Sequence, residues 1–232
     1  TEKLSEFIEA GEMTAQYVPV ESEHSALAAC IAASSTGARA FTATSANGLL
    51  YMHEQVHWAA GARLPIVMCV VNRAVGAPWN IWNDHQDAIS QRDTGWIQMY
   101  CCDHQQIIDS VLKAFAIAET VSIPVMVCYD GFLLSHTMMP VDVPSAEVVD
   151  GFLQPRTAPL QIVDVNDPRN VGPVVMAGPR ADADGVLQPG YMELRAMHNA
   201  ALLEALEAVP VADVEWAAAI GRTWGGLTSE YL

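Results

Sequence analysis

An unbroken apolar run at residues 65–72, PIVMCVVN, constrains the fold of this chain more than any other stretch. A strand with one solvated face alternates apolar and polar residues, whereas a parallel strand covered on both faces reads as a continuous apolar run. A second run of this kind, VMVCY, occupies residues 125–129. The sequence therefore predicts a parallel sheet with helices on both of its faces.

The segments around these runs alternate between strand and helix patterns, which is typical of a doubly wound α/β fold. Tyr17, Val18 and Val20 form a short β-prone run, residues 39–44 (RAFTAT) predict a strand, and residues 96–102 predict a weaker one. Gly37 suits the end of the helix that precedes the strand at residues 39–44, because glycine adopts the left-handed conformation readily. Helices are predicted at residues 3–10, 26–35, from about 47 to 61, after Asp103, at 192–208 and at 211–220.

The composition changes after His136, since nine of the 13 prolines lie from Pro140 onward. We predict an α/β domain at residues 1–139, an extended proline-rich arm at 140–190 and C-terminal helices at 191–232. The chain begins abruptly at Thr1 and stops soon after the Gly225-Gly226 pair. It is expected to be truncated at both ends.

Composition excludes several classes of function. A net charge of −16 disfavours binding to nucleic acid or to an anionic membrane. The sequence contains no signal peptide and no apolar run of membrane-spanning length. Its five cysteines lack CxxC spacing and lie mostly in apolar runs, which indicates reduced thiols, with the Cys101-Cys102 pair expected in the core. We expect a cytoplasmic protein that binds neither nucleic acid nor a membrane.

Two carboxylates, Glu21 and Glu23, precede the helix at residues 26–35, at a predicted strand-to-helix transition. Open α/β sheets bind ligands at such transitions. One interpretation is that these carboxylates cap the helix and complement its dipole. The other is that one of them exchanges protons with a cofactor. The residues alone leave both open.

Arg73 follows the strand at residues 65–72 and opens a long loop rich in tryptophan. It is either paired with a nearby acid such as Asp84 or Asp87, or presented to a substrate carboxylate that its guanidinium can bind with two hydrogen bonds. Long loops inside compact domains are often functional, which favours the second interpretation.

His53, Glu54 and His57 form an H-E-x-x-H pattern on a predicted helix, where two histidines four residues apart could bind zinc. A zinc hydrolase is therefore an alternative function. The extended metzincin pattern is absent downstream, which favours a chance match. There is also no Walker A or G-x-G-x-x-G motif, so the sequence does not support a nucleotide phosphate site.

Three segments together resemble one family: VPVESEHSALAACIAASSTGARAFTATSANGLLYMHE, LPIVMCVVNRAVGAPWNIWNDHQDAISQRDTGWIQ and PVMVCYDGFLLSHT. They are similar to the alpha subunit of pyruvate:ferredoxin oxidoreductase and of related 2-oxoacid:acceptor oxidoreductases. The resemblance covers residues 1–140 in order, with a weaker echo after Tyr191. It implies the thiamine diphosphate-binding fold, and within it the domain that binds the aminopyrimidine ring.

The resemblance also implies roles for individual residues. Glu23 would hydrogen-bond the pyrimidine nitrogen and so promote loss of the thiazolium proton, which requires a carboxyl group shielded from water. Arg73 would hold the substrate carboxylate. Asn47, Gly76 and Trp79 depart from the residues common in the family, which leaves the choice of 2-oxoacid open. The implied catalytic residues are Glu23 and Arg73, the implied cofactor-binding residues are Glu23, Thr44, Ser45, Asn47, Gly48 and Asn72, and no metal ligand is implied.

The implied reaction is oxidative decarboxylation of a 2-oxoacid, with pyruvate expected, together with coenzyme A, giving acyl-CoA, CO₂ and reduced ferredoxin. Thiamine diphosphate would be shared with a beta subunit or domain that carries the diphosphate and Mg²⁺ site. The [4Fe-4S] clusters would belong to a ferredoxin-like subunit, a gamma subunit or domain would complete the assembly, and ferredoxin or flavodoxin would accept the electrons. A catalytically silent structural paralogue is a third possibility.

Overall fold

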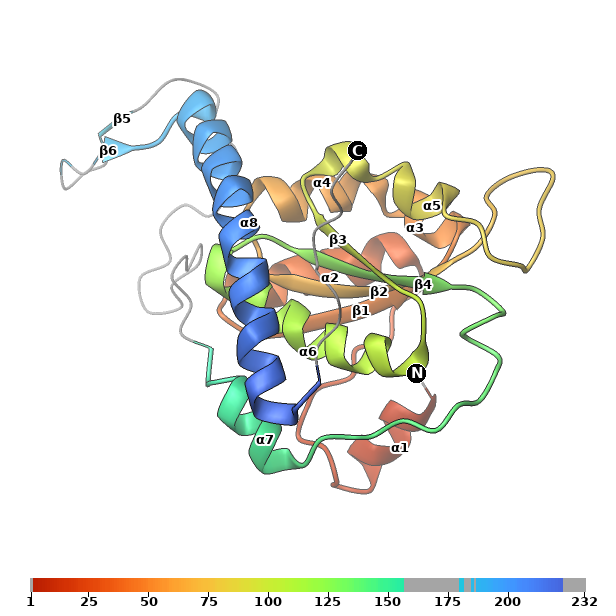
Figure 1. The fold of residues 1–232 in the computed structure, drawn as a ribbon. Helices are drawn as coiled ribbons and strands as arrows, with labels where there is room; N and C mark the ends of the chain where they lie inside the picture. The colour runs from red at the N-terminus through yellow and green to blue at the C-terminus, as the bar shows by residue number, and fades with distance from the viewer. Residues whose placement is uncertain (1, 157–179, 182–184, 186, 223–232) are drawn as a thin grey trace, which may run out of the picture.

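A computed structural model of the chain describes residues 2–156, 180–181, 185 and 187–222 (Figure 1). Its centre is a four-stranded sheet in which every neighbouring pair is parallel, as the apolar runs predict. The spatial order is β1-β2-β4-β3, so the two most apolar strands lie in the middle. The strands are β1 (Ala40–Thr44), β2 (Ile66–Asn72), β3 (Ile97–Cys101) and β4 (Val125–Asp130).

Helices cover both faces of the sheet, and the α/β prediction is confirmed. Asp103 caps α6 as expected, since its side chain accepts a hydrogen bond of 2.8 Å from the Gln106 amide. A two-stranded hairpin joins β5 (Arg180–Ala181) to β6 (Leu187–Gln188). The helices are α1 (Glu2–Glu9), α2 (Glu23–Ser35), α3 (Asn47–Tyr51), α4 (His53–Gly61), α5 (Gln86–Ile89), α6 (His104–Val121), α7 (Ala146–Phe152) and α8 (Tyr191–Ile220), with a 3-10 turn at Arg92–Thr94.

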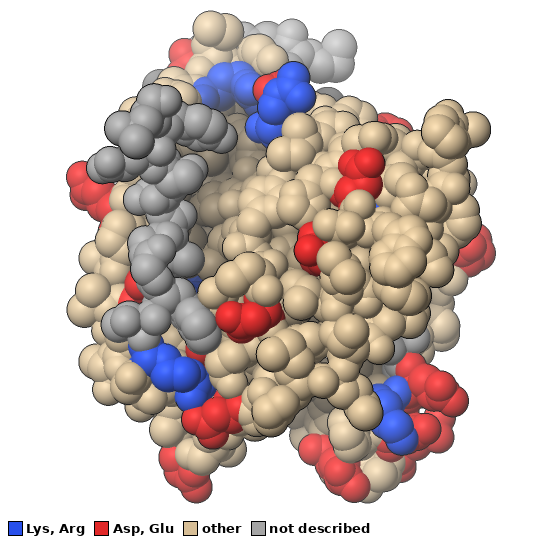
Figure 2. All heavy atoms as spheres, turned by 45° about the vertical axis from the view of Figure 1, so that its right-hand side comes forward, with Lys and Arg blue, Asp and Glu red and all other residues tan. Residues whose placement is uncertain are grey.

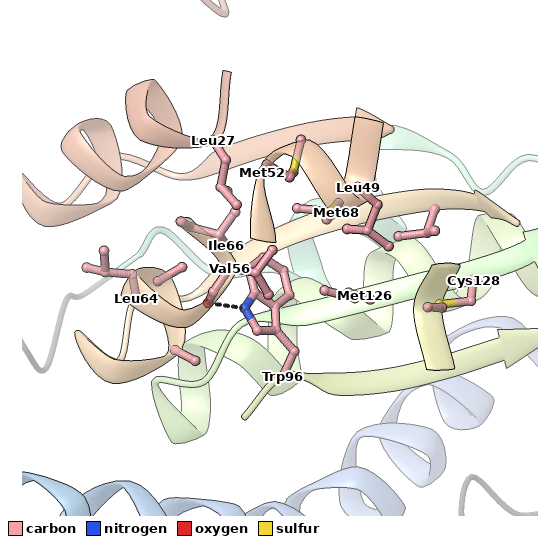
Figure 3. Close-up of a cluster of buried hydrophobic side chains, with 14 of the residues drawn as sticks. Leu27, Leu49, Met52, Val56, Leu64, Ile66, Met68, Trp96, Met126 and Cys128 are labelled. Carbon is pink, nitrogen blue, oxygen red and sulfur yellow. Dashed lines mark hydrogen bonds between the residues drawn. The ribbon is translucent and has the colours of Figure 1, made fainter. Parts of the chain in front are cut away.

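One core layer lies between the sheet and helices α2, α3 and α4 (Figure 3). Trp96 anchors it, because its indole Nε1 donates a 2.8 Å hydrogen bond to the Val56 carbonyl while the ring packs among apolar side chains. Each fully buried Leu, Ile, Val or Met side chain of this layer contributes about 1.5–3 kcal/mol. The fully buried members include Leu27, Leu49, Met52, Val56, Leu64, Ile66, Met68 and Met126.

The opposite face is covered by α6, and α8 packs outside α6. Lys113 on α6 is fully buried and donates to Asp213 on α8 at 2.8 Å, and Asp109 pairs with Arg222 at 3.2 Å. Buried charges must be paired or fully hydrogen-bonded to be tolerated, so these contacts fix α8 at a single position on α6.

Several predicted elements differ from the structure. Residues 17–20 form no strand, the helix expected from about 47 to 61 is divided at Met52, and the predicted arm contains α7. The two helices predicted near the C-terminus are one, because α8 continues through Pro210. Pro210 is exposed, so the carbonyl that loses its amide donor can bond water instead. The division into residues 1–139, 140–190 and 191–232 stays a prediction.

Candidate functional site

Three adjacent strands bring the predicted site residues to one edge of the sheet. Thr44 ends β1, Asn72 ends β2 beside it, and Asn72 is paired in register with Asp130 at the end of β4. This is the carboxyl edge, where open α/β sheets bind ligands. Ser45, Arg73 and the loop at residues 76–84 continue from these strand ends.

A buried carboxylate, Asp87, joins two of the loops at this edge. Its side chain is fully buried. Its Oδ2 accepts from the Ala46 amide at 2.9 Å and from the Arg73 amide at 3.1 Å. Its Oδ1 accepts from Asn72 Nδ2 at 2.7 Å and from the Ala88 amide at 2.8 Å. Four donors therefore compensate the burial of this charge.

The interpretation of Arg73 as the partner of Asp84 or Asp87 is wrong for its guanidinium. Asp87 binds only the backbone of Arg73, and within the described residues no ion pair joins the Arg73 side chain to a carboxylate. The guanidinium Nε instead donates to Ser45 Oγ at 2.6 Å, and Ser45 Oγ donates to the Val71 carbonyl at 2.6 Å. The side chain is thus held by a neutral hydroxyl, which leaves its charge available.

The turn between β1 and α3 is strained at Ala46, whose φ of 46° and ψ of −118° are unusual for a residue with a side chain. Such a conformation costs on the order of 1–3 kcal/mol and persists only where surrounding contacts hold it. The hydrogen bond from its amide to Asp87 is such a contact. The strain lies beside Ser45, which orients Arg73.

Glu23 is the first residue of α2 and lies against the start of α3. A Cβ built on Gly48 would lie 2.9 Å from Glu23 Oε1 and 2.7 Å from Thr44 Oγ1, so only glycine leaves room for both side chains. Ser22, and not Glu23, caps α2, because its hydroxyl accepts from the Ser25 amide at 3.2 Å. Helix capping therefore does not account for Glu23, although its place in the first turn of α2 suits the helix dipole.

The described residues do not provide the expected shielding of Glu23, which is exposed. Thr44, in contrast, is 9% exposed, and its hydroxyl has no hydrogen-bond partner among the described residues. Beside Gly48 there are thus an exposed carboxylate, Glu23, and a buried hydroxyl without a hydrogen-bond partner among the described residues, Thr44.

The two asparagines hold the site together in different ways. Asn47 is exposed, and its Oδ1 accepts from the Gly76 amide at 3.1 Å, which ties the turn before α3 to the long loop. Asn72 is fully buried, donates to Asp87, and has no partner for its Oδ1 within the described part of the chain. Asn72 is therefore buried beneath the carboxyl edge of the sheet, whereas Asn47 lies on its surface.

The H-E-x-x-H pattern lies on α4. Its histidine rings are 4.8 Å apart, but His53 Nδ1 is 2.6 Å from Gln91 Oε1, and Glu54 lies 3.6 Å from His24. Among the described residues, no group of three His, Cys, Asp or Glu side chains is placed to hold a metal ion. The zinc-hydrolase alternative therefore lacks a third ligand from that part of the chain.

The cysteines are free thiols, and most are shielded. Burial raises the pKa of Cys69 to about 12 and the pKa of Cys101 to about 11, which keeps both protonated and unreactive. Cys102 is exposed, so the prediction that it lies in the core is wrong for this member of the pair.

The surface around the site carries few charges. Figure 2 brings forward the side on which the strands end; most of its coloured surface is uncharged, with separate acidic groups across it and lysine or arginine groups towards its margins. Trp79 and Trp82 are each 51% exposed in the long loop, and the Trp82 ring packs against Phe132 at a tilt of 60°, with 4.3 Å between ring centroids. Large exposed apolar surfaces of this kind mark sites of association. No helix in the described ranges is long and apolar enough to cross a bilayer.

Fold and site together define an open α/β domain with a polar site at the carboxyl edge of a parallel sheet. Residues 1–200 match the family described as "Pyruvate flavodoxin/ferredoxin oxidoreductase, thiamine diP-bdg". The chain belongs to this family.

Curated relatives agree with this assignment. The chain is 57% identical over 171 residues to ketoisovalerate oxidoreductase subunit VorA of Pyrococcus abyssi, covering 74% of this chain and 43% of the relative. It is 48% identical over 233 residues to pyruvate synthase subunit PorA of Methanocaldococcus jannaschii, covering 99% of this chain and 57% of the relative. The chain thus spans about half the length of the curated relatives it matches.

A solved structure has the same fold. It is described as 2-oxoglutarate:ferredoxin oxidoreductase from Magnetococcus marinus with 2-oxoglutarate, coenzyme A and succinyl-CoA bound. The TM-score is 0.55 at 16% identity, over 90% of this chain and 39% of the other.

Sequence reasoning identified Glu23, Arg73 and the turn at residues 44–48, and the structure brings all of them to the carboxyl edge. It did not identify the role of Asp87 in joining the loops or the strain at Ala46. Asp87 is followed by Ala88 and Ile89, and an acid that opens an apolar turn is a weak signal of burial.

Proposed function

We propose that this chain is part of the alpha subunit of a thiamine diphosphate-dependent 2-oxoacid:ferredoxin oxidoreductase and binds the aminopyrimidine ring of the cofactor. The observation that carries the proposal is the placement of Glu23 beside Gly48 and Thr44, at the edge where Arg73 is also held. The family assignment to a thiamine diphosphate-binding domain supports it.

The residues present suit one side of such a cofactor. Thr44 Oγ1 lacks a partner, Glu23 is free to donate or accept at a ring nitrogen, and Gly48 has no side chain to exclude a flat ring. When bound, thiamine diphosphate supplies a carbon nucleophile and an electron sink for decarboxylation. The task of Glu23 is to hold and move a proton at the pyrimidine nitrogen. The task of Arg73 is to orient a 2-oxoacid through its carboxylate.

The proposal includes partners, because this chain contains no glycine-rich phosphate cradle. The diphosphate and Mg²⁺ would be held by a beta subunit or domain, which would also cover Glu23. The [4Fe-4S] clusters, a gamma subunit or domain, coenzyme A, and ferredoxin or flavodoxin as acceptor complete the proposed reaction. The sparse charge of the face in Figure 2 supports such an assembly. A cytoplasmic location is part of this proposal.

Two substrates have specific support. Pyruvate is favoured because relatives that match essentially the whole chain are named pyruvate synthase subunits. A branched 2-oxoacid is favoured by the higher identity to ketoisovalerate oxidoreductase subunits over 171 residues. The full-length protein, assembled with its partner subunits, should reduce ferredoxin when given coenzyme A and one of these acids. If neither acid supports reduction, the proposed function is wrong.

Sharing of the cofactor is tested with the chain of residues 1–232. Calorimetric titration with Mg²⁺ and thiamine diphosphate should give no tight binding, because the anchoring diphosphate site lies elsewhere. The assembled enzyme serves as the positive control. Binding at micromolar or lower concentration by the chain alone would mean that the pocket is contained within it.

The zinc alternative has its own test. Metal analysis should find no stoichiometric zinc bound through His53, so the zinc content of the assembled protein should be the same in wild type and in His53→Ala. Stoichiometric zinc that disappears in this variant would favour the hydrolase.

A further inference from the structure

We propose that Asp87 is a positioning residue, which acts through the turn at Ser45-Ala46 and through the Arg73 backbone to aim the Arg73 guanidinium at the substrate carboxylate. This inference rests on the proposed function. It assigns a role to a residue that itself lies behind the site and cannot touch the substrate.

The first step is the cost of the buried charge. Asp87 is fully buried, and within the described residues no cationic side chain forms an ion pair with it. A buried carboxylate is tolerated only when hydrogen bonds replace its lost hydration. Its two oxygens accept four hydrogen bonds, and three of these come from residues 46, 72 and 73. The carboxylate is therefore organised around the loops that carry the site.

The second step is the connection between these loops. A single oxygen, Oδ2, accepts from the Ala46 amide and from the Arg73 amide, so it fixes the start of α3 relative to the end of β2. Ala46 needs such a contact because its φ is positive. Asp87 thereby sets the distance between the neighbouring Ser45 and the Arg73 side chain.

The third step is the orientation of the guanidinium. Ser45 Oγ accepts from Arg73 Nε at 2.6 Å, while the stem of Arg73 packs over Gly131. With Nε occupied, the two terminal nitrogens are the donors left to bind a carboxylate. A displacement of the Ser45 turn would therefore rotate the guanidinium without removing its charge.

The test is Asp87→Asn in the full-length, assembled enzyme. Each oxygen of Asp87 accepts hydrogen bonds from two N–H donors. The asparagine side chain therefore places its NH₂ group against two donors, whichever way it is turned. We expect kcat/KM for the 2-oxoacid to fall by about 10²-fold, mainly through KM, because misplacement of a positioning group by about 1 Å has effects of this size. Thiamine diphosphate affinity should change much less.

The matched control is Asp109→Asn, which alters another fully buried carboxylate, on α6, whose contacts include Arg222 and Gln105. It should lower stability without raising KM. A second variant, Ala46→Gly/Asp87→Asn, tests the relay directly. Glycine adopts a positive φ without strain, so the double variant should recover part of the lost KM and remain usable if Asp87→Asn alone does not assemble.

The outcomes separate the two proposals. Wild-type enzyme without 2-oxoacid turnover would contradict the proposed function. The positioning role would be overturned if the assembled Asp87 variants turn over the 2-oxoacid with the same KM as Asp109→Asn. A raised KM that Ala46→Gly leaves entirely unrelieved in the double variant would also overturn the relay through the turn.

Discussion

The two halves of the candidate site differ in how far this chain completes them. The Arg73 half comprises Ser45, Ala46, Asn72, Arg73 and Asp87, and internal hydrogen bonds of 2.6–3.1 Å connect its members. The Glu23 half comprises Glu23, Thr44 and Gly48. Its carboxylate is exposed and its hydroxyl lacks a partner among the described residues.

This difference indicates which half of the site the described residues complete and which half they leave incomplete. The Arg73 half is assembled before any partner binds, because a buried carboxylate and a strained turn already hold it. Under the proposed function, the Glu23 half would need a surface from outside the described residues to exclude water from the carboxylate. Changes to the packed interior of the first half should therefore cost stability, and changes to the second should mainly alter chemistry.

The largest effect is expected from Glu23→Gln. Glutamine keeps the shape but cannot exchange a proton, so cofactor activation in the assembled enzyme should slow by about 10²–10⁴-fold. The stability of the protein should not change, since the side chain is exposed. Exchange of the thiazolium proton with deuterium measures the step directly. An unchanged exchange rate would contradict the role given to Glu23.

A pair of glycine substitutions compares the halves directly. In Gly131→Ala the new Cβ would lie 2.6 Å from the Asn72 carbonyl oxygen, a backbone atom, and the variant should lose about 1–3 kcal/mol of unfolding free energy. In Gly48→Ala the new Cβ meets Thr44 and the exposed Glu23 side chain, which can swing away.

Gly48→Ala should therefore lose less stability than Gly131→Ala, because the Glu23 side chain can move and alanine has an advantage of roughly 1 kcal/mol within a helix, while thiazolium proton exchange slows. Urea unfolding of the full-length variants and the deuterium assay measure the two effects. Equal stability losses would show that the halves do not differ as described.

Arg73→Lys should have a smaller effect that is confined to substrate binding. Lysine keeps the charge but loses the planar fork and the hydrogen bond to Ser45. Since hydrogen bonds to charged groups contribute about 1.5–3 kcal/mol, KM for the 2-oxoacid should rise roughly tenfold or more. Cofactor affinity should not change. A loss of cofactor affinity with an unaltered KM would mean that Arg73 belongs to the Glu23 half.

The smallest effect concerns His198 on α8, which lies in neither half and packs against Gly95, before β3 begins. Burial, and after it Arg195 and Arg63, lower the pKa of His198, against the hydrogen bond to the Gly95 carbonyl. The folded state therefore binds this proton less readily than the unfolded state. Stability is full above the ordinary pKa of 6.5 and falls as the pH drops below it.

Urea unfolding at about pH 7.5 and about pH 5.5 should show this loss, and His198→Gln should reduce it. KM for the 2-oxoacid should not follow the same titration. Identical pH dependence in wild type and His198→Gln would exclude this contribution.

The sheet was predictable because its signals are local. The runs at β2 and β4 contain no polar residue before their ends, and Asp103 marks the start of α6. The order of the strands and the contact between Glu23 and Gly48 were not, because they depend on pairing between distant segments.

Other features contradict local rules. Proline normally ends a helix, yet α8 continues through Pro210 because Val209, Ala212 and Trp216 are buried on either side of it. Alanine rarely adopts a positive φ, yet Ala46 does so because Asp87 binds its amide. In both places tertiary contacts outweigh the local preference.

The strand order also has a consequence during synthesis. β2 pairs with β1 on one side, but its other neighbour, β4, begins about 50 residues later in the chain. At about 5–20 residues per second, the nascent chain carries an open apolar strand edge for roughly 3–10 s before β4 can cover it. Unpaired edges of this kind recruit other chains. Soluble yield is therefore expected to depend on a ribosome-associated chaperone, which expression with and without that chaperone would measure.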